Sequence, residues 1–254
     1  MNLFRLFTVV MMCTVATMYA HADGIQQCQK VVIAGDSQWP PYTLISANGL
    51  QGIGMDLAQQ IFAELDIEVE LTEYQDTTQM LQGLRSGKID IIVSTYDYPD
   101  INIDATLLQP EYIVDQITVA VPITISSSII SWDNLVGFNG IVDSNFIPDD
   151  QTHNFLSSYL TITTKDDLLT DLLAVHAGTY KYIVGSDLQL SYAIKNNNMA
   201  TDLIVMKNLT KGGNIHMAFS NNSACQLYSV YVQKRLQDYK NNGTVEKIMR
   251  QYIY

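Results

Sequence analysis

Residues 31–42 read VVIAGDSQWPPY, and this stretch decides the fold. An apolar strand (31–35) runs into a turn that carries Asp36, Trp39 and two prolines. A glycine turn and an acidic helix start follow in 52–58 (GIGMDLA), and 86–94 (SGKIDIIVS) ends on a second apolar run. Ligands of open α/β sheets bind beyond the carboxyl ends of strands, where Asp36, Trp39 and Ser94 fall. The stretch therefore predicts the mouth of a small-molecule site.

Strand-like and helix-like segments alternate along the whole chain with short loops between them. This alternation predicts an α/β fold with mainly parallel sheets flanked by helices. Asp56 is the expected cap of the first helix, and Asp166 or Asp167 that of the third. The predicted helices are 56–65, 77–85, 166–176, 187–196, 224–239 and 244–253, and the predicted strands are 31–35, 67–74, 89–94, 117–122, 140–142, 182–185, 203–206 and 215–220.

Two of these segments, 117–122 and 215–220, are extended apolar runs about a hundred residues apart, with a unit of strands and helices between them. They predict two lobes joined by a two-strand hinge. The first lobe is expected to comprise residues 23–118 plus 216–254, and the inserted second lobe residues 119–215.

Residues 1–22 are predicted to be a signal peptide. They contain a positive Arg5, an apolar segment and the sequence Ala20-His21-Ala22, after which cleavage is expected. Cys13 lacks the small preceding residue of a lipid-modified cysteine, so we expect secretion without a lipid anchor. Removing the leader leaves 13 basic and 26 acidic side chains, a net charge of −13. Such an acidic chain is a poor partner for nucleic acid or an anionic membrane.

Two cysteines, Cys28 and Cys225, remain after the leader. In an oxidising compartment they are a candidate disulfide that would join the amino terminus to the carboxy-terminal part. The alternative is a pair of separate buried thiols. The three histidines of the mature chain are scattered and no cysteine-histidine spacing typical of a metal site occurs, so we expect neither metal nor cofactor.

The order of these blocks resembles family 3 of the bacterial extracellular solute-binding proteins, the receptors of ABC importers. The resemblance rests on Trp39-Pro40-Pro41-Tyr42 followed by the glycine turn, on 84–92 (LRSGKIDII) and on 242–252 (NGTVEKIMRQY). It implies a two-lobed, type II periplasmic-binding-protein fold that closes on its ligand.

The resemblance also implies ligand-contacting positions. Trp39 and Tyr42 match aromatic positions, of which the first commonly walls the ligand; the alternative is that both rings pack inside the lobe. Asp36 would face a cationic group or cap its own turn, and Asp97 would attract an amine or lie on a loop surface. The full set of candidates is Asp36, Trp39, Tyr42, Ser94, Thr95, Tyr96, Asp97, Asn102, Asp143, Asn145, Ser186 and Asp187.

The chain departs from the amino-acid-binding pattern where the ligand carboxylate is normally bound. Members that bind amino acids carry an arginine that forms a bidentate fork, and Asn102 stands at the matching position. The acidic partner of the ligand ammonium would fall on Ser186, one residue before Asp187. The second-lobe Gly-Thr step is replaced by 143–146 (DSNF).

These features predict a monomeric, non-enzymatic binding protein for a small polar ligand, amino acid-like or amine-like, that delivers it to ABC transporter membrane subunits or to a sensor. The aromatic residues, Asp36 and Asp97 favour a cationic or neutral ligand. A ligand-sensing or degenerate module on the same fold is the alternative, and a dehydratase-type enzyme is a further one.

Overall fold

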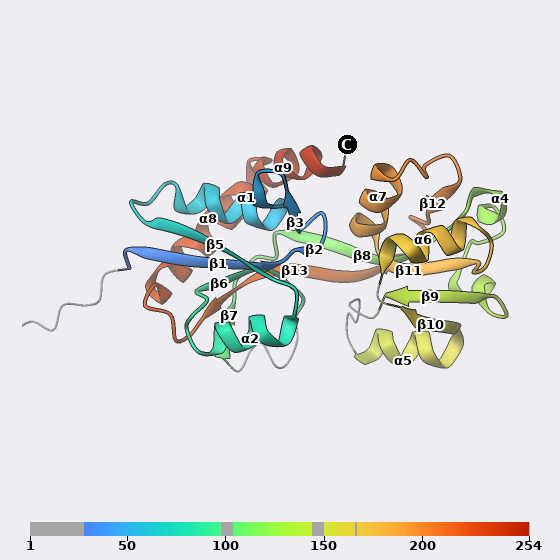
Figure 1. Ribbon diagram of the computed structural model, residues 1–254, viewed down its shortest axis with the longest axis horizontal. Helices are drawn as coiled ribbons and strands as arrows, with labels where there is room; N and C mark the ends of the chain where they lie inside the picture. Colours follow the sequence, from blue (N-terminus) through green and yellow to red (C-terminus); the bar gives the residue numbers. More distant parts are fainter. Residues whose placement is uncertain (1–27, 98–103, 144–149, 166, 254) are drawn as a thin grey trace, which may run out of the picture.

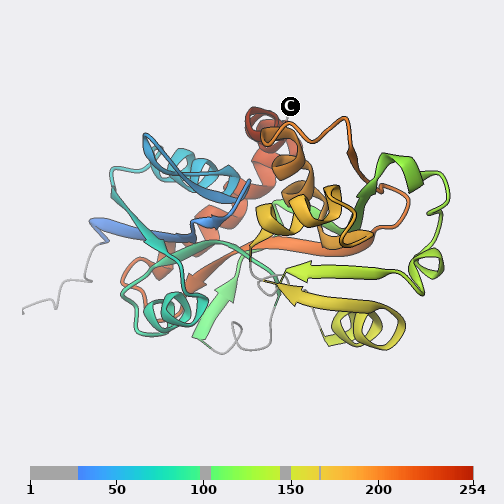
Figure 2. The same cartoon turned by 45° about the vertical axis from the view of Figure 1, so that its right-hand side comes forward.

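The computed structural model describes residues 28–97, 104–143, 150–165 and 167–253, and the predicted leader lies outside these ranges. The molecule has two lobes that lie side by side along its long axis, and two long strands run between them (Figures 1 and 2). It is an α/β fold, as the alternation of segments predicts.

The first lobe is built on three parallel strands. β1 (Lys30–Asp36) lies between β5 (Glu68–Tyr74) and β6 (Ile91–Thr95). Every residue of β6 is buried, as expected for a parallel strand covered on both faces. The covering helices lie on both sides of these strands (Figure 1); they are α1 (Ile53–Phe62), α2 (Thr77–Arg85), α8 (Ser229–Asn241) and α9 (Thr244–Ile253).

A small antiparallel sheet follows β1 directly. It consists of β2 (Gln38–Trp39), β3 (Thr43–Ser46) and β4 (Gly49–Gln51), and none of these strands is predicted by the sequence patterns. The sheet leads into Gly52, whose φ of 126° lies in the region that favours glycine. A Cβ there would collide with the backbone carbonyl of Tyr42, so this close approach requires glycine.

The prediction that Asp56 caps the first helix is wrong. α1 begins at Ile53 with Gly52 as its amino-terminal cap, which places Asp56 inside the first turn. Its carboxylate accepts a hydrogen bond from the Tyr252 hydroxyl at 2.6 Å and thereby binds α1 to α9. In α6 (Leu168–His176), by contrast, Asp167 is the cap and accepts from the Thr170 backbone N–H, as predicted.

The two strands that cross between the lobes are β8 (Ile113–Pro122) and β13 (Lys211–Ser220). They pair antiparallel with each other between Ile113 and Ile117 of β8. Beyond this pairing β13 continues into the first lobe, where it lies beside β6 and β7 (Ala105–Leu107), and β8 continues into the second. Together they form the two-strand hinge, hereafter the hinge.

The second lobe is built on β11 (Tyr182–Ser186), which lies between β8 and the parallel strand β9 (Asn139–Asp143). Its other elements complete the sheet or cover it; they are β10 (Thr161–Lys165), β12 (Leu203–Val205), α4 (Ile123–Ser126), the short 3-10 helix Trp132–Leu135, α5 (Asp150–Tyr159), α6 and α7 (Asp187–Asn196). The sequence patterns do not predict α5, because its apolar positions are few.

Most predicted elements are present with end shifts of one to four residues. α2, α7 and α9 have the predicted bounds. The helix predicted to start at residue 224 is the main exception, because a 3-10 turn (Gln226–Tyr228) precedes α8 and delays its start to Ser229.

Cys28 and Cys225 form a disulfide with their Cα atoms 4.9 Å apart. Both residues are buried, and the bridge links the start of β1 to the segment that precedes α8. Of the two alternatives left open by the sequence, the structure contains the disulfide.

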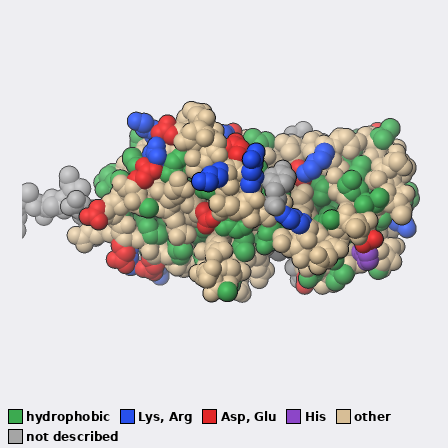
Figure 3. Space-filling view, turned by 90° about the horizontal axis from the view of Figure 1, so that it is seen from above, with side chains coloured by type: hydrophobic (Ala, Val, Ile, Leu, Met, Phe, Trp, Pro, Cys, Tyr) green, Lys and Arg blue, Asp and Glu red, His purple; other side chains and the backbone are tan. Residues whose placement is uncertain are grey.

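Within the described residues, no helix is both long and apolar enough to cross a membrane. On the face seen in Figure 3, acidic and basic side chains are interspersed rather than separated into single-sign patches.

Candidate ligand-binding site

Three aromatic rings of the first lobe gather at its junction with the second. Trp39 lies on β2, Tyr42 follows in the turn, and Tyr96 comes directly after β6. The Trp39 ring centroid is 5.0 Å from that of Tyr42 and 5.3 Å from that of Tyr96, in tilted arrangements. Tyr42 and Tyr96 are buried and Trp39 is half-buried, so Trp39 offers the more accessible face of this cluster.

A carboxylate from the hinge lies beside these rings. Asp115, on β8, is only 1 % exposed, and its Oδ2 accepts a hydrogen bond from the Tyr96 hydroxyl at 3.0 Å. Its Oδ1 accepts from the Gln116 backbone N–H at 2.9 Å. The ion pairs found among the described residues do not include Asp115. Asp115 is thus a buried acid that is bound by neutral donors.

The second lobe approaches the same carboxylate through the amino end of α7. Ser186 is fully buried and caps this helix, with its Oγ accepting from the Gln189 backbone N–H at 3.1 Å. The Tyr42 hydroxyl lies 3.4 Å from the same Ser186 Oγ, so a polar contact joins the two lobes. Side chains from the first lobe, the hinge and the second lobe therefore meet at one point, and we call Trp39, Tyr42, Tyr96, Asp115 and Ser186 the junction cluster.

The electrostatics of the junction cluster follow from burial. Burial raises the pKa of Asp115, while hydrogen bonds from Ser186, Tyr42 and Tyr96 and from the Leu188 backbone N–H oppose that rise. Burial also raises the pKa of Tyr42 well above its usual value, and the nearby Asp115 charge adds to this effect. The Tyr42 side chain therefore acts as a neutral hydrogen-bond donor and acceptor at physiological pH.

Two hydroxyls expected at the ligand point into the first lobe instead. The Ser94 hydroxyl lies 2.7 Å from the Tyr112 hydroxyl, in a buried contact beneath α1. The Thr95 hydroxyl donates to the Tyr96 backbone carbonyl at 2.9 Å and is also buried. These two residues lie directly before the cluster in sequence, and in this structure their hydroxyls are bound within their own lobe.

Three of the expected acids lie around the cluster rather than in it. Asp36 is half-buried, and its Oδ1 accepts from the Gln38 backbone N–H at 2.8 Å, a turn-capping contact. Asp97 is exposed at the end of the described segment. Asp187, in the first turn of α7, forms an ion pair with Lys207 and accepts from the Ser191 hydroxyl.

The remaining candidates lie where the structure gives no side-chain description. Asn102 and Asn145 are outside the described residues. For Asp143 the backbone is described, as the last residue of β9, but the side chain is not.

The sequence-based reasoning missed Asp115. A signal for it exists, because Asp115 is the one acid within the apolar run of residues 113–121 (IVDQITVAV). A charged residue inside an otherwise apolar hinge strand needs hydrogen-bonding partners, and the structure supplies them from both lobes.

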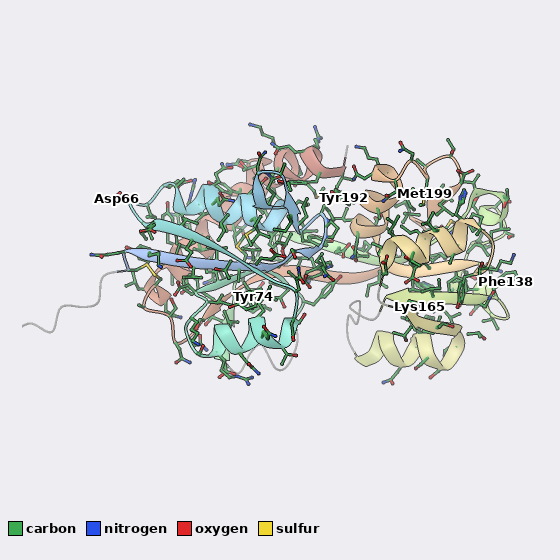
Figure 4. All side chains as sticks on the ribbon, viewed as in Figure 1. Asp66, Tyr74, Phe138, Lys165, Tyr192 and Met199 are labelled. Carbon is green, nitrogen blue, oxygen red and sulfur yellow. A yellow bond between two sulfur atoms is a disulfide. The ribbon has the colours of Figure 1, made fainter. Side chains whose placement is uncertain are left out.

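A second contact joins the lobes above the cluster. The Lys195 ammonium of α7 donates to the Ile253 backbone carbonyl at the end of α9, over 3.1 Å. Tyr192, also on α7, lies on the side of that helix toward the first lobe (Figure 4). Among the described residues there is no group of three acids, histidines or cysteines that could hold a metal ion.

Solved structures with this fold are numerous, and three illustrate their range. The amino acid ABC transporter substrate-binding protein AbpA from Streptococcus pneumoniae, bound to L-arginine, is 17 % identical with a TM-score of 0.72, over 90 % of this chain and 96 % of that one. An ancestral amino acid-binding protein, a precursor of cyclohexadienyl dehydratase, is 19 % identical with a TM-score of 0.70, over 91 % and 99 %. The periplasmic VFT2 domain of BvgS from Bordetella pertussis is 16 % identical with a TM-score of 0.72, over 90 % and 95 %.

At these identities the likeness shows the fold, which is the two-lobed, type II periplasmic-binding-protein fold. No curated protein matches the sequence significantly. The model of the bacterial extracellular solute-binding proteins, family 3, however, matches residues 31–254, which is most of the chain. The chain belongs to this family.

Proposed function

We propose that this protein is a periplasmic solute-binding protein that closes on a small polar ligand, amino acid-like or amine-like, and delivers it to an ABC importer. The observation that carries the proposal is the junction cluster, in which aromatic and polar side chains of both lobes and the hinge converge. Pockets for small ligands combine such aromatic walls with a few placed polar groups. The family and the fold support a binding role, and a neighbouring protein with the same fold binds L-arginine.

The proposal extends to the lobes and the compartment. We assign residues 23–118 and 216–254 to the first lobe and 119–215 to the second, so that relative motion occurs in the hinge. Residues 1–22 act as a cleaved signal peptide, and the mature chain, a monomer, begins at Asp23. Amino-terminal sequencing of periplasmic material tests this, and an intact Met1 in that fraction contradicts it.

Binding is tested by isothermal titration calorimetry of protein that has been unfolded and refolded to remove bound solutes. The panel comprises the common amino acids, small amines and small carboxylic acids. We expect micromolar or tighter binding of at least one amino acid or amine, with a reduced radius of gyration in solution scattering when it binds. If no compound binds, the transport function is wrong.

A ligand-sensing or degenerate module is the second candidate, and one observation favours it. The Tyr42 hydroxyl contacts Ser186 of the other lobe directly, so the chain's own side chains join the lobes. The periplasmic VFT2 domain of BvgS shares the fold. If scattering of the protein alone already gives the compact radius and no panel compound changes it, this candidate replaces the transport proposal.

We expect no catalysis, although one neighbour is a precursor of a dehydratase. Proton NMR of each panel compound incubated with the protein tests this, and the appearance of any dehydrated product would contradict it.

A further inference from the structure

The buried acid in the hinge has a position that no other acid of the described chain shares. Asp115 lies on β8 within the part that pairs with β13, opposite Gly213, between the two lobes. Its carboxylate is bound by the Tyr96 hydroxyl from the first lobe and by the backbone of Gln116. Ser186 and the Leu188 backbone N–H of the second lobe also bind this carboxylate, so Asp115 lies at the boundary between the two lobes.

The cover over Asp115 comes from the second lobe. Ser186 and the first turn of α7 lie on the far side of the junction, and Ser186 contacts Tyr42 at 3.4 Å. When a two-lobed protein opens about its hinge, elements of the opposite lobe move away while the hinge strand and the first-lobe side chains stay together. Opening would therefore expose Asp115 beside the rings of Trp39, Tyr42 and Tyr96.

The chemistry of this surface favours a cation. An ionised carboxylate that is buried without a counter-charge is unfavourable, and no described basic side chain forms an ion pair with Asp115. Aromatic faces within reach of the same point attract ammonium and guanidinium groups. A ligand that brings a carboxylate to this point would instead meet a like charge in a poorly solvated place.

We propose that Asp115 is the specificity-determining residue of the site, selecting ligands that place a side-chain ammonium or guanidinium group at the junction and rejecting those that place a carboxylate there. This rests on the proposed function and names its ligand class. Among the described acids near the cluster, Asp36 is bound to its own turn and Asp187 to Lys207. Asp115 belongs to the cluster itself and binds the Tyr96 hydroxyl.

The test uses three probes that differ in one group each. The side chain of L-arginine is cationic, L-citrulline carries the same α-ammonium and α-carboxylate on a neutral isosteric side chain, and agmatine is arginine without the carboxylate. Calorimetry of the full mature chain should show L-arginine or agmatine binding at least about 10-fold more tightly than L-citrulline. In Asp115→Asn, binding of that cationic probe should weaken by about 30-fold or more, as expected when a buried charge pair loses one partner, and binding of L-citrulline by only about 3-fold.

Two further variants separate charge from structure. Asp115→Glu keeps the charge, so its preference for the cationic probe over L-citrulline should remain even where overall affinity falls. Glu68 is an exposed acid on β5, far from the junction. Glu68→Gln removes one negative charge, as Asp115→Asn does, and should change neither the affinity for the cationic probe nor that for L-citrulline. Circular dichroism confirms that each variant is folded, and if Asp115→Asn is not, Asp115→Glu and Tyr96→Phe carry the test.

Four results overturn the inference. Equal weakening of L-arginine and L-citrulline in Asp115→Asn shows a purely structural acid. If Asp115→Glu no longer prefers the cationic probe over L-citrulline, Asp115 is likewise a purely structural acid. Binding of L-citrulline or L-glutamate at least as tight as that of L-arginine by the unaltered protein rejects the ligand class but leaves the proposed function standing. Absence of binding to every probe and panel compound rejects both.

Discussion

Two carboxylates of this protein are surrounded by tyrosine hydroxyls, and they differ in almost everything else. Glu64, at the end of α1, accepts from the Tyr231 and Tyr239 hydroxyls and forms an ion pair with Arg235 at 2.6 Å, partly in water. Its pKa falls to about 2, mainly through the hydrogen bond from Arg235. Asp115 has tyrosine and serine partners without a basic one, and burial raises its pKa.

The two carboxylates belong to two kinds of side-chain cluster, one formed within a single lobe and one formed between the lobes. The helical face formed by α1, α8 and α9 is held by contacts within the first lobe, among them the Glu64–Arg235 ion pair, the Asp56–Tyr252 bond and the nearby disulfide. The junction cluster depends on contacts that belong to different lobes and is incomplete in charge. The first arrangement is expected to stabilise the fold, and the second to respond to lobe position and ligand.

Removing the disulfide should have the largest effect, and only on stability. Cys28→Ser with Cys225→Ser opens a loop of 197 residues, for which the chain-entropy model gives about 5 kcal/mol. Urea unfolding followed by fluorescence measures the loss. Ligand affinity of the folded fraction should not change, because the bridge is remote from the junction cluster. A large loss of affinity would contradict the distinction between contacts that stabilise the fold and contacts that bind the ligand.

Trp39→Ala should show the reverse pattern. Trp39 is the half-buried ring of the cluster, so its removal should weaken binding of whichever panel compound binds best by about 30-fold, or roughly 2 kcal/mol. The midpoint of urea unfolding should move little, since the ring is only partly buried. Unchanged affinity in calorimetry would show that Trp39 does not wall the ligand.

A matched pair of hydroxyl deletions compares the two carboxylates directly. Tyr96→Phe leaves the buried Asp115 short of a donor and should cost about 1–3 kcal/mol of unfolding free energy. Tyr231→Phe removes a donor to Glu64, which is exposed and keeps two others, and should cost less than about 1 kcal/mol. Equal costs in urea unfolding would remove the distinction between a carboxylate that has a basic partner and one that has none.

The smallest effects are those of pH, and their signs should be opposite. The folded pKa of Glu64 lies below its unfolded value, so its contribution is present above about pH 4.5 and is lost as pH falls toward 2. Because this group is partly exposed, we expect only about 1 kcal/mol. The folded pKa of Asp115 is raised, so its contribution is greatest below its unfolded pKa and is lost as pH rises through the folded value.

The measurement is the unfolding free energy of the unaltered protein minus that of Glu64→Gln or Asp115→Asn, between pH 7 and pH 3. This difference should decrease on acidification for Glu64→Gln and increase for Asp115→Asn. The same sign for both would show that the two carboxylates do not differ as described.

Much of the fold could be predicted from local patterns, and the failures have physical causes. Strong apolar runs and amphipathic spacing gave β1, β6, α2 and α7 nearly to the residue. α5 was missed because its sequence, DQTHNFLSSY, has few apolar positions, so tertiary packing rather than periodicity holds it as a helix. Asp56 was expected to cap α1, but the cap is Gly52, which approaches the Tyr42 backbone closely, so the helix begins four residues earlier than a cap at Asp56 would place it.

The candidate site was predictable only in part. The resemblance to the family named Trp39, Tyr42, Tyr96 and Ser186 as candidates, and the structure brings these four side chains together in the junction cluster, while their contact with a ligand stays a prediction. The direction of a hydroxyl could not be predicted from position alone, since Ser94 and Thr95 lie on the same strand end and are bound inside their lobe.

By itself, the sequence determined the α/β alternation, the two-strand hinge, the candidate disulfide and the aromatic turn after β1, because these depend on residue type and spacing along the chain. The tertiary structure alone decided that Cys28 and Cys225 pair, that Asp56 binds Tyr252, and that Asp115 meets Tyr96 beside Ser186. Those contacts join residues 19 to 197 positions apart, and the local pattern of a chain carries no information about which distant groups share a buried space.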